Sequence, residues 1–403
     1  MGNEIELASV ITDIAAGPFG SNLKVECFVP YGFPIIDGAN LKGYKVTDNL
    51  TKFVTEEKAR FLSRSIARRG DVVVTISGTL GQIAYIPEDS MFEEYLCSQR
   101  QFRVSFDTSQ VYVPYLVFYF HTFEGQNKIL SFANQTGVPA LSQPLKNFKK
   151  IRLCLPDYPT QKKIASIIEA FNDKIECNQK INDNLELQAQ LIYSERFEGV
   201  KSNDLPSGWR VVPLGEIAMI SNKNFNPLKE SERILEHYSI PAFDETKFPI
   251  FEPSTSIKSN KFVVDSSCFL ISKLNPTVKR VWKPYCLTGS AVCSTEFIVY
   301  KSKNSYITDF LYSVIDSNSF SDFMCSHVTG STGSRQRTIP SDTLSYKVIL
   351  PSEDELIRFQ SLVSPIYSRI RNNAIENDRL KQLRNSLLPK LMSGEIDVSS
   401  IKI

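Results

Sequence analysis

The stretch PTQKKIASIIEAFNDKIECNQKINDN, residues 159–184, decides the fold of this chain. Its apolar side chains recur every seven residues, the spacing of a helix whose apolar face packs against a second helix. The seam positions are Ile164, Phe171, Asn178, Leu185 and Ile192. A pattern sustained this long is typical of a coiled coil, so the sequence predicts a long helix over residues 160–198.

A second stretch, VILPSEDELIRFQSLVSPIYSRI at 348–370, repeats the layout of LCLPDYPTQKKIASIIEAFNDKI at 153–175. Each copy has an apolar strand, a Leu-Pro pair and the start of a helix, which predicts a second long helix over residues 355–392. Its equivalent seam positions are Phe359, Ile366, Asn373, Leu380 and Leu387. Both copies therefore carry an asparagine at the middle of the seam.

The paired asparagines favour two helices that pack antiparallel in one fixed register. An amide in an apolar seam lowers stability, but it disfavours slipped registers that would leave its hydrogen-bonding groups unpaired. In an antiparallel pair the middle positions meet, so we expect Asn178 to face Asn373, with Asn182 and Asn377 on the adjoining stripe. The alternative, two surface helices on separate domains, leaves the matching asparagines unexplained.

The repetition extends upstream of both helices. Residues 67–87 share a strand, turn and strand layout with 262–285, and SNDLPSG at 202–208 has the composition of a linker. We therefore predict a mixed α/β (α+β) protein with an internal pseudo-twofold repeat. Its predicted parts are a first domain at 1–155, a first helix at 156–200, a second domain at 201–350, and a second helix with a tail at 351–403.

The composition is that of a well-packed globular protein. A chain of 403 residues, 42% of them hydrophobic, has the length of two domains. No apolar run approaches the length of a membrane span, and the eight cysteines form no C-x-x-C pair, so we expect a cytoplasmic protein with free thiols. The net charge of +2 means that any nucleic-acid surface must be a local patch.

The sequence contains no recognisable catalytic motif. It lacks the G-x-x-x-x-G-K-[ST] loop that binds nucleotide phosphates and the N-P-P-[YF] signature of adenine methyltransferases. Its three histidines are scattered, and no carboxylates are paired at metal-ligand spacing. We therefore predict a binding protein with no catalytic residues and no metal site.

Several segments together resemble the DNA specificity subunit of type I restriction-modification systems. They are GPFGSNLK at 17–24, GDVVVTISGTLGQ at 70–82, QTGVPALSQ at 135–143, PTQKKIASII at 159–168 and LPSGWRVVPLGEI at 205–217. The resemblance spans essentially the whole chain. It implies two target-recognition domains that the helices hold apart, each reading one half of a bipartite site in double-stranded DNA.

The resemblance also implies that the chemistry belongs to partner subunits. Two methyltransferase subunits would bring S-adenosylmethionine, and restriction subunits would use ATP and Mg²⁺ for translocation and cleavage. The specificity subunit itself would hold no cofactor.

Polar turns supply the candidate DNA-binding residues. Base edges are read by Arg, Lys, Asn, Gln, Ser and Thr, and contacts to phosphate fix the register of the protein on the duplex. In the first half the candidates are Ser21, Asn22, Lys24, Ser77, Thr79, Gln82, Gln99, Arg100 and Gln101. In the second half they are Asn222, Lys223, Asn224, Lys273, Asn275, Lys279, Arg280, Arg335, Gln336 and Arg337.

Two other functions are compatible with these features. One is a non-catalytic protein–protein scaffold built on the coiled coil, and the other is the recognition subunit of a type II-like methyltransferase or nuclease. Salt-dependent binding to duplex DNA would separate a DNA-binding protein from the scaffold, because neutralised phosphates release counterions.

Overall fold

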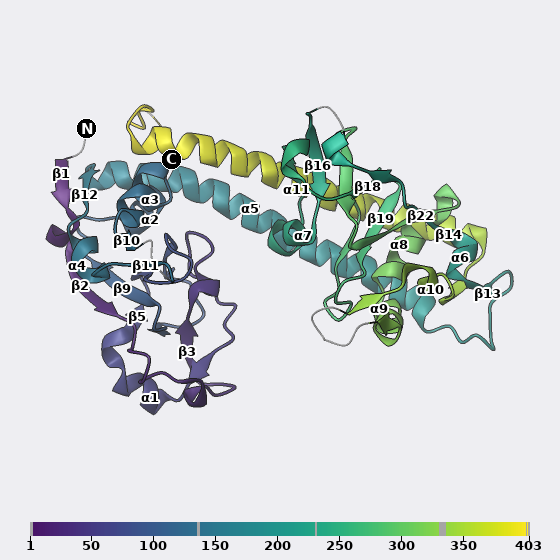
Figure 1. Cartoon of the computed structure of the whole chain (residues 1–403), viewed down its shortest axis with the longest axis horizontal. Coiled ribbons are helices and arrows are strands. Elements are labelled where there is room, and N and C mark those ends of the chain that lie inside the picture. Colours follow the sequence, from purple (N-terminus) through teal and green to yellow (C-terminus); the bar gives the residue numbers. More distant parts are fainter. Residues whose placement is uncertain (1–2, 135–137, 230–231, 330–335, 400, 402–403) are drawn as a thin grey trace. The chain divides into compact units, whose positions relative to one another are not determined.

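The computed structural model describes residues 3–134, 138–229, 232–329, 336–399 and 401 (Figure 1). The chain divides into two compact units, a first unit of residues 1–175 and 379–403 and a second unit of residues 176–378. Each unit therefore combines one α/β domain with part of each long helix. The predicted domain boundaries instead separate each helix from its domain.

The domain of the first unit is built on two small sheets. One is antiparallel with the order β2-β9-β6-β7, and the other has the order β4-β3-β8-β5 with β3 and β8 parallel. The strands are β2 (Ile11–Ala16), β3 (Phe33–Ile36), β4 (Phe53–Val54), β5 (Ile66–Arg68), β6 (Val72–Thr75), β7 (Ile83–Tyr85), β8 (Glu94–Cys97) and β9 (Gln101–Phe106). The first sheet is covered by α2 (Val113–Phe120), whose Val117 and Phe120 share a buried cluster with Val72 and Phe102.

Short elements complete the first unit. Strand β1 pairs antiparallel with β12, and β10 pairs with β11 in a small hairpin. These elements are β1 (Asn3–Glu6), α1 (Glu56–Phe61), α3 (Phe123–Leu130), β10 (Ala133–Asn134), β11 (Ala140–Leu141), α4 (Pro144–Lys149) and β12 (Arg152–Leu155).

The second unit repeats this topology with one additional strand, β15, at the edge of its second sheet. Its antiparallel sheet has the order β14-β22-β19-β20, and its other sheet has the order β15-β18-β21-β16-β17, with β16 and β21 parallel. The strands are β14 (Ala218–Ile220), β15 (Asn224–Phe225), β16 (Ile234–Tyr238), β17 (Ile250–Pro253), β18 (Lys261–Val263), β19 (Cys268–Ser272), β20 (Val281–Trp282), β21 (Ala291–Ser294) and β22 (Phe297–Ser302). The predicted internal repeat is confirmed at the level of strand order.

Two further strand pairs of the second unit also have counterparts in the first. Strand β13 pairs with β25 as β1 pairs with β12, and β23 pairs with β24 as β10 pairs with β11. The elements outside the two sheets are β13 (Arg210–Pro213), α6 (Leu214–Ile217), α7 (Ile240–Thr246), α8 (Thr308–Asp316), α9 (Asn318–Ser326), β23 (Val328–Thr329), β24 (Arg337–Thr338), α10 (Pro340–Thr343) and β25 (Lys347–Leu350).

The two predicted long helices are α5 (Tyr158–Tyr193) and α11 (Glu353–Met392), and a π-helical segment, Ser194–Glu198, continues α5. In the second unit, Asn182 contacts Asn373 and the ring of Tyr193 lies 6.3 Å from that of Phe359. Later residues of α5 thus meet earlier residues of α11, so the prediction of an antiparallel pair is confirmed. In the first unit, Ile164 shares a buried cluster with Leu388 and Leu391.

Helix α5 is joined to the first domain by a buried glutamine. The Gln161 side chain is 0% exposed, accepts a hydrogen bond from the Tyr112 amide at 2.8 Å and donates to the carbonyls of Gln110 and Pro156. The two bonds with Gln110 and Tyr112 fix the start of α5 against the loop before α2. Within the described part of the chain, no helix is long and apolar enough to cross a membrane.

Candidate nucleic-acid interface

Four loops of the first unit converge into one polar surface, which we call the first loop cluster: residues 17–24, 76–82, 98–101 and 138–141. The loop after β2 is tied to the β8–β9 turn by the bond from Gly17 N to Gln101 O at 2.8 Å. The β6–β7 hairpin is tied to the β10–β11 hairpin by the bond from Gly78 N to Pro139 O at 3.0 Å. Segments far apart in sequence are therefore held together by backbone hydrogen bonds.

Glycines permit this convergence. A Cβ atom on Gly17 would lie 1.8 Å from the Ser98 carbonyl oxygen, so no larger residue fits against the β8–β9 turn. Gly78 and Gly81 have φ angles of +95° and +85°, a region that other residues rarely adopt. Glycine is thus required at positions 17, 78 and 81 by the geometry of the loops.

Most candidates of the first half lie on this cluster and face solvent. Exposed side chains are those of Ser21, Asn22, Lys24, Thr79, Gln99 and Arg100, and Ser77 is partly exposed. Arg100 has no acidic partner among the residues that the structure describes. The first loop cluster therefore presents a cation beside several neutral hydrogen-bonding groups.

Two glutamines of the first half are corrections to the prediction. Gln101 is 1% exposed and accepts a hydrogen bond from the Ser98 hydroxyl, so its amide holds the turn together. Gln82 donates to the Gly38 carbonyl at 3.0 Å and accepts from the Thr75 hydroxyl at 3.1 Å. Because both amides are used inside the domain, neither side chain is placed to read a base.

The second unit forms an equivalent surface, which we call the second loop cluster: residues 221–224, 272–280, 294–297 and 336–338. Backbone bonds again join the loops, from Asn275 N to Gln336 O at 2.9 Å, from Lys273 N to Glu296 O at 2.9 Å, and from Thr338 N to Lys273 O at 3.1 Å. Asn275 has a φ of +48°, in the left-handed region that asparagine tolerates better than most residues.

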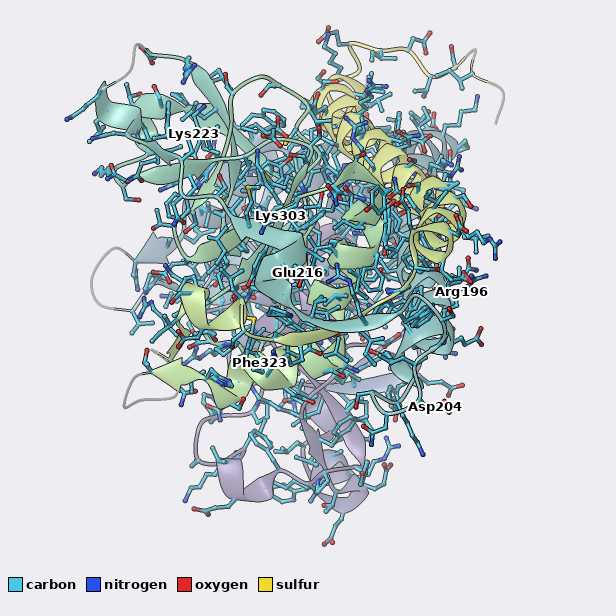
Figure 2. All side chains as sticks on the ribbon, turned by 90° about the vertical axis from the view of Figure 1, so that its right-hand side faces the viewer. Arg196, Asp204, Glu216, Lys223, Lys303 and Phe323 are labelled. Atoms are coloured by element: carbon cyan, nitrogen blue, oxygen red, sulfur yellow. The ribbon has the colours of Figure 1, made fainter. Side chains whose placement is uncertain are left out.

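Six candidates of the second half have exposed or partly exposed side chains, and all but Asn224, which begins β15, lie on loops. Asn222, Lys223 and Asn224 are exposed, and Lys273, Asn275 and Gln336 are partly exposed. Figure 2 shows Lys223 at the left of the view of the second unit, with Arg196, just after α5, at the right. Arg335 lies outside the described residues.

Three basic candidates of the second half, Lys279, Arg280 and Arg337, are held by acidic partners that the sequence prediction missed. Arg280 forms two hydrogen bonds with Asp244, at 2.6 and 2.9 Å, and its side chain is only 14% exposed. Lys279 lies 3.1 Å from the Asp316 carboxylate and donates to the Asp316 carbonyl. The prediction that Arg280 reads DNA is wrong for this conformation, since its guanidinium fastens α7 to the β19–β20 hairpin.

Arg337 is also paired, but at the surface. Its Nε and Nη2 atoms donate to the two carboxylate oxygens of Glu296 at 3.0 and 3.1 Å. The hydrogen bond to Glu296 raises the pKa of Arg337 above its ordinary value, so the pair stays ionised. Glu296 occupies the turn that carries Arg100 in the first unit, so the two loop clusters differ in charge at equivalent positions.

The asparagine seam lies within the second unit and departs from the predicted pairing. The Asn178 Nδ2 group donates to Asn377 Oδ1 at 2.9 Å and to Glu376 Oε2 at 2.9 Å, and Asn373 donates to Asn182 Oδ1 at 2.8 Å. The predicted direct bond between Asn178 and Asn373 is therefore wrong by one helical turn. Each seam asparagine is instead bonded to an asparagine on the adjoining stripe of the other helix, Asn178 to Asn377 and Asn373 to Asn182. The Asn178 Oδ1 atom has no hydrogen-bond partner.

No group of three or more His, Cys, Asp or Glu side chains that could hold a metal occurs in the described ranges.

Comparisons with known proteins agree with this architecture. A family model described as type I restriction modification DNA specificity domain matches residues 26–187. The MjaIX specificity subunit of Methanocaldococcus jannaschii is 24% identical over 86% of this chain and 82% of its own length. The HindI specificity subunit of Haemophilus influenzae is 26% identical over 61% of this chain and 69% of its own length.

One solved structure shares the fold. The type I restriction-modification S subunit from M. genitalium has a TM-score of 0.58 and 14% sequence identity, with 97% of this chain and 96% of that chain covered.

Proposed function

We propose that this chain belongs to the DNA specificity subunits of type I restriction-modification systems. On that basis, we propose that it reads a bipartite DNA site, with one loop cluster for each half-site. The protein is a non-catalytic subunit that supplies sequence recognition. The observation that supports the proposal is the repeated domain: the shared strand order gives each of the two domains a polar loop cluster at the equivalent position. Neither the scaffold nor the type II-like alternative is favoured by the comparisons.

The two loop clusters have the side chains that base reading needs. Asn22, Thr79 and Arg100 in the first cluster, and Asn222 with Asn224 in the second, offer donors and acceptors that match major-groove base edges. Lys24 and Lys223 are exposed and suited to phosphate. Local basic groups on a chain of net charge +2 are expected to give modest attraction, so we expect tight binding only when partner subunits add contacts.

The partners that we propose are two methyltransferase subunits, which bring S-adenosylmethionine, and restriction subunits, which use ATP and Mg²⁺. Exposed apolar side chains on the long helices support docking there. Leu187 and Leu191 are 54% and 50% exposed and lie one turn apart on α5, and Ile357 of α11 is 49% exposed. Such an assembly would modify the chromosome, so we place it in the cytoplasm.

The function can be tested by mapping methylated adenines in the source genome with and without this gene. Loss of methylation at one bipartite motif is the expected result. A complex assembled with the methyltransferase should then bind a duplex of that motif with an affinity that falls steeply as salt increases. An unchanged methylation pattern, together with salt-independent association, would instead support the scaffold.

A further inference from the structure

Phe19 is an exposed aromatic residue at the tip of the first loop cluster. Its side chain is 82% exposed, and Val138 on the neighbouring hairpin is 72% exposed. A single apolar side chain at a surface needs no explanation. The exposure of Phe19 does need an explanation, because Phe19 belongs to the same loop cluster as the polar groups proposed to contact DNA.

The loop that carries Phe19 is fixed on both sides. Gly17 is bonded to the β8–β9 turn, the Asn22 amide donates to the Phe19 carbonyl at 2.8 Å, and Leu23 is 2% exposed in a buried cluster. The Gln99 side chain also donates to the Leu23 carbonyl. The ring is therefore exposed because an ordered loop presents it to solvent.

The second unit shows the contrasting arrangement. There the short strand β15, which follows β14, also contains a phenylalanine followed shortly by Leu-Lys, in the segment Phe225 to Lys229. Phe225 is 9% exposed, packs with Leu235, Ile257 and Val292, and lies 5.0 Å beneath the Arg233 guanidinium. The same type of residue is thus part of the core in one unit and left uncovered in the other.

The other side chains exposed on the first loop cluster are of the types that bind base edges in the major groove. Ser21, Asn22, Lys24, Thr79 and Arg100 are exposed on the same cluster. Among major-groove edges, thymine alone offers an apolar C5-methyl group beside its O4 acceptor, and phenylalanine is a known partner for that methyl group. An unstacking wedge, by contrast, enters from the minor groove and costs unstacking free energy.

We infer that Phe19 contacts the C5-methyl group of a thymine in the half-site read by the first unit. This inference rests on the proposed function and adds to it a specificity-determining residue. The ring covers the methyl group while the neighbouring polar side chains bind the base edges, so replacing thymine by uracil removes only the contact with Phe19.

The test uses the chain assembled with its methyltransferase subunits and duplexes that contain the mapped site. Each thymine of the half-site is replaced by uracil in turn, and affinity is measured for the wild-type and Phe19→Ala complexes. We expect the wild type to lose about fourfold at one position, the value of one buried methyl group. Phe19→Ala should lose a similar factor on the natural site and become insensitive to uracil at that position.

Two matched variants complete the design. Phe123→Ala removes a phenylalanine of the same unit that is 84% exposed but lies on α3, and it should bind like the wild type. Phe19→Leu keeps an apolar side chain and should retain part of the uracil sensitivity. Thermal unfolding of all three variants should match the wild type, because both positions are exposed.

Three results would overturn the inference: uracil sensitivity that persists in Phe19→Ala, affinity unchanged by Phe19→Ala, or a first half-site that contains no thymine. These differ from failure of the proposed function, in which the wild-type complex itself would not prefer its mapped site over a scrambled duplex. That last result would remove both conclusions together.

Discussion

At the scale of single residues, the arginines of the loop clusters divide by their partners. Arg280 is fastened to Asp244 by two hydrogen bonds, whereas Arg100 is exposed and has no acidic partner in the described part of the chain. A guanidinium already satisfied within the domain contributes to stability, and an unsatisfied one at the surface is available to guanine or phosphate.

Arg100→Ala should therefore weaken binding of the assembled complex to its site by about 1–3 kcal/mol, the range for one lost base contact. Arg280→Ala should leave that affinity nearly unchanged and lower the unfolding temperature of the protein. Fluorescence anisotropy with labelled duplexes and thermal unfolding would measure the two effects. An equal loss of DNA affinity in both variants would contradict this division of roles.

At the scale of the elements, the β2–β9 pair contains an ion pair with a definite pH dependence. Arg103 is 7% exposed and donates to Asp13 at 2.7 Å, and this hydrogen bond lowers the pKa of Asp13 below its ordinary value of 3.8. A carboxyl group whose pKa is lower in the folded protein stabilises the fold above the unfolded pKa. That contribution is lost as the pH falls through the lowered value.

Asp13→Asn should reduce the free energy of unfolding near pH 7 by up to about 1 kcal/mol, because solvent screens the largely exposed Asp13. The difference between variant and wild type should shrink as the pH falls below 4. Urea unfolding at several pH values would measure it, with the exposed Asp89→Asn as the control. If the difference in unfolding free energy between variant and wild type instead grew as the pH fell, the pKa of Asp13 would not be lowered by folding.

The asparagine seam makes the second prediction at this scale. Replacing Asn178 and Asn377 together by Leu removes one bonded amide pair and a buried acceptor without a partner, so the unfolding temperature should rise. Replacing Asn178 and Asn373 together breaks two different amide pairs and should be less stabilising. Equal effects of the two double variants, measured by thermal unfolding, would argue against the observed pairing.

The long helices could be predicted because the seven-residue spacing of their apolar side chains can be read from a continuous stretch of sequence. Helices α5 and α11 begin at Tyr158 and Glu353, each within two residues of its predicted start. The pairing of Asn178 was not accessible, since a shift of one turn along a seam of similar side chains depends on how those side chains interlock.

The burial of Gln101 and the ion pair of Arg280 could not be predicted from the sequence for another reason. Gln101 is bonded to Ser98 within its own turn, and Arg280 is bonded to Asp244 on α7, which is 36 residues away in sequence. A polar residue in a turn has the same sequence signature whether it faces solvent or binds a neighbouring loop. The exposed candidates, such as Asn22 and Lys223, were predictable because their loops follow directly from the strand pattern.

At the scale of the whole molecule, the internal repeat implies that the two half-sites are read independently. The loop clusters are built by separate sheets of the same topology, and each is closed by its own backbone hydrogen bonds. Substitutions more than about 10 Å apart that share no partners usually have additive effects on free energy. Arg100 and Asn222 belong to different units, and both are exposed on their loop clusters, so they provide a pair for testing this.

Asn222→Ala should weaken recognition of the second half-site by about 1–3 kcal/mol and leave discrimination at the first unchanged, and Arg100→Ala should do the reverse. Competition binding with duplexes altered in one half-site at a time would measure both, using the complex with methyltransferase subunits. The double variant should show the sum of the two losses, because the two residues lie in different units. Loss of discrimination at both half-sites from either single variant would mean that the two domains do not act as independent readers, despite their common fold.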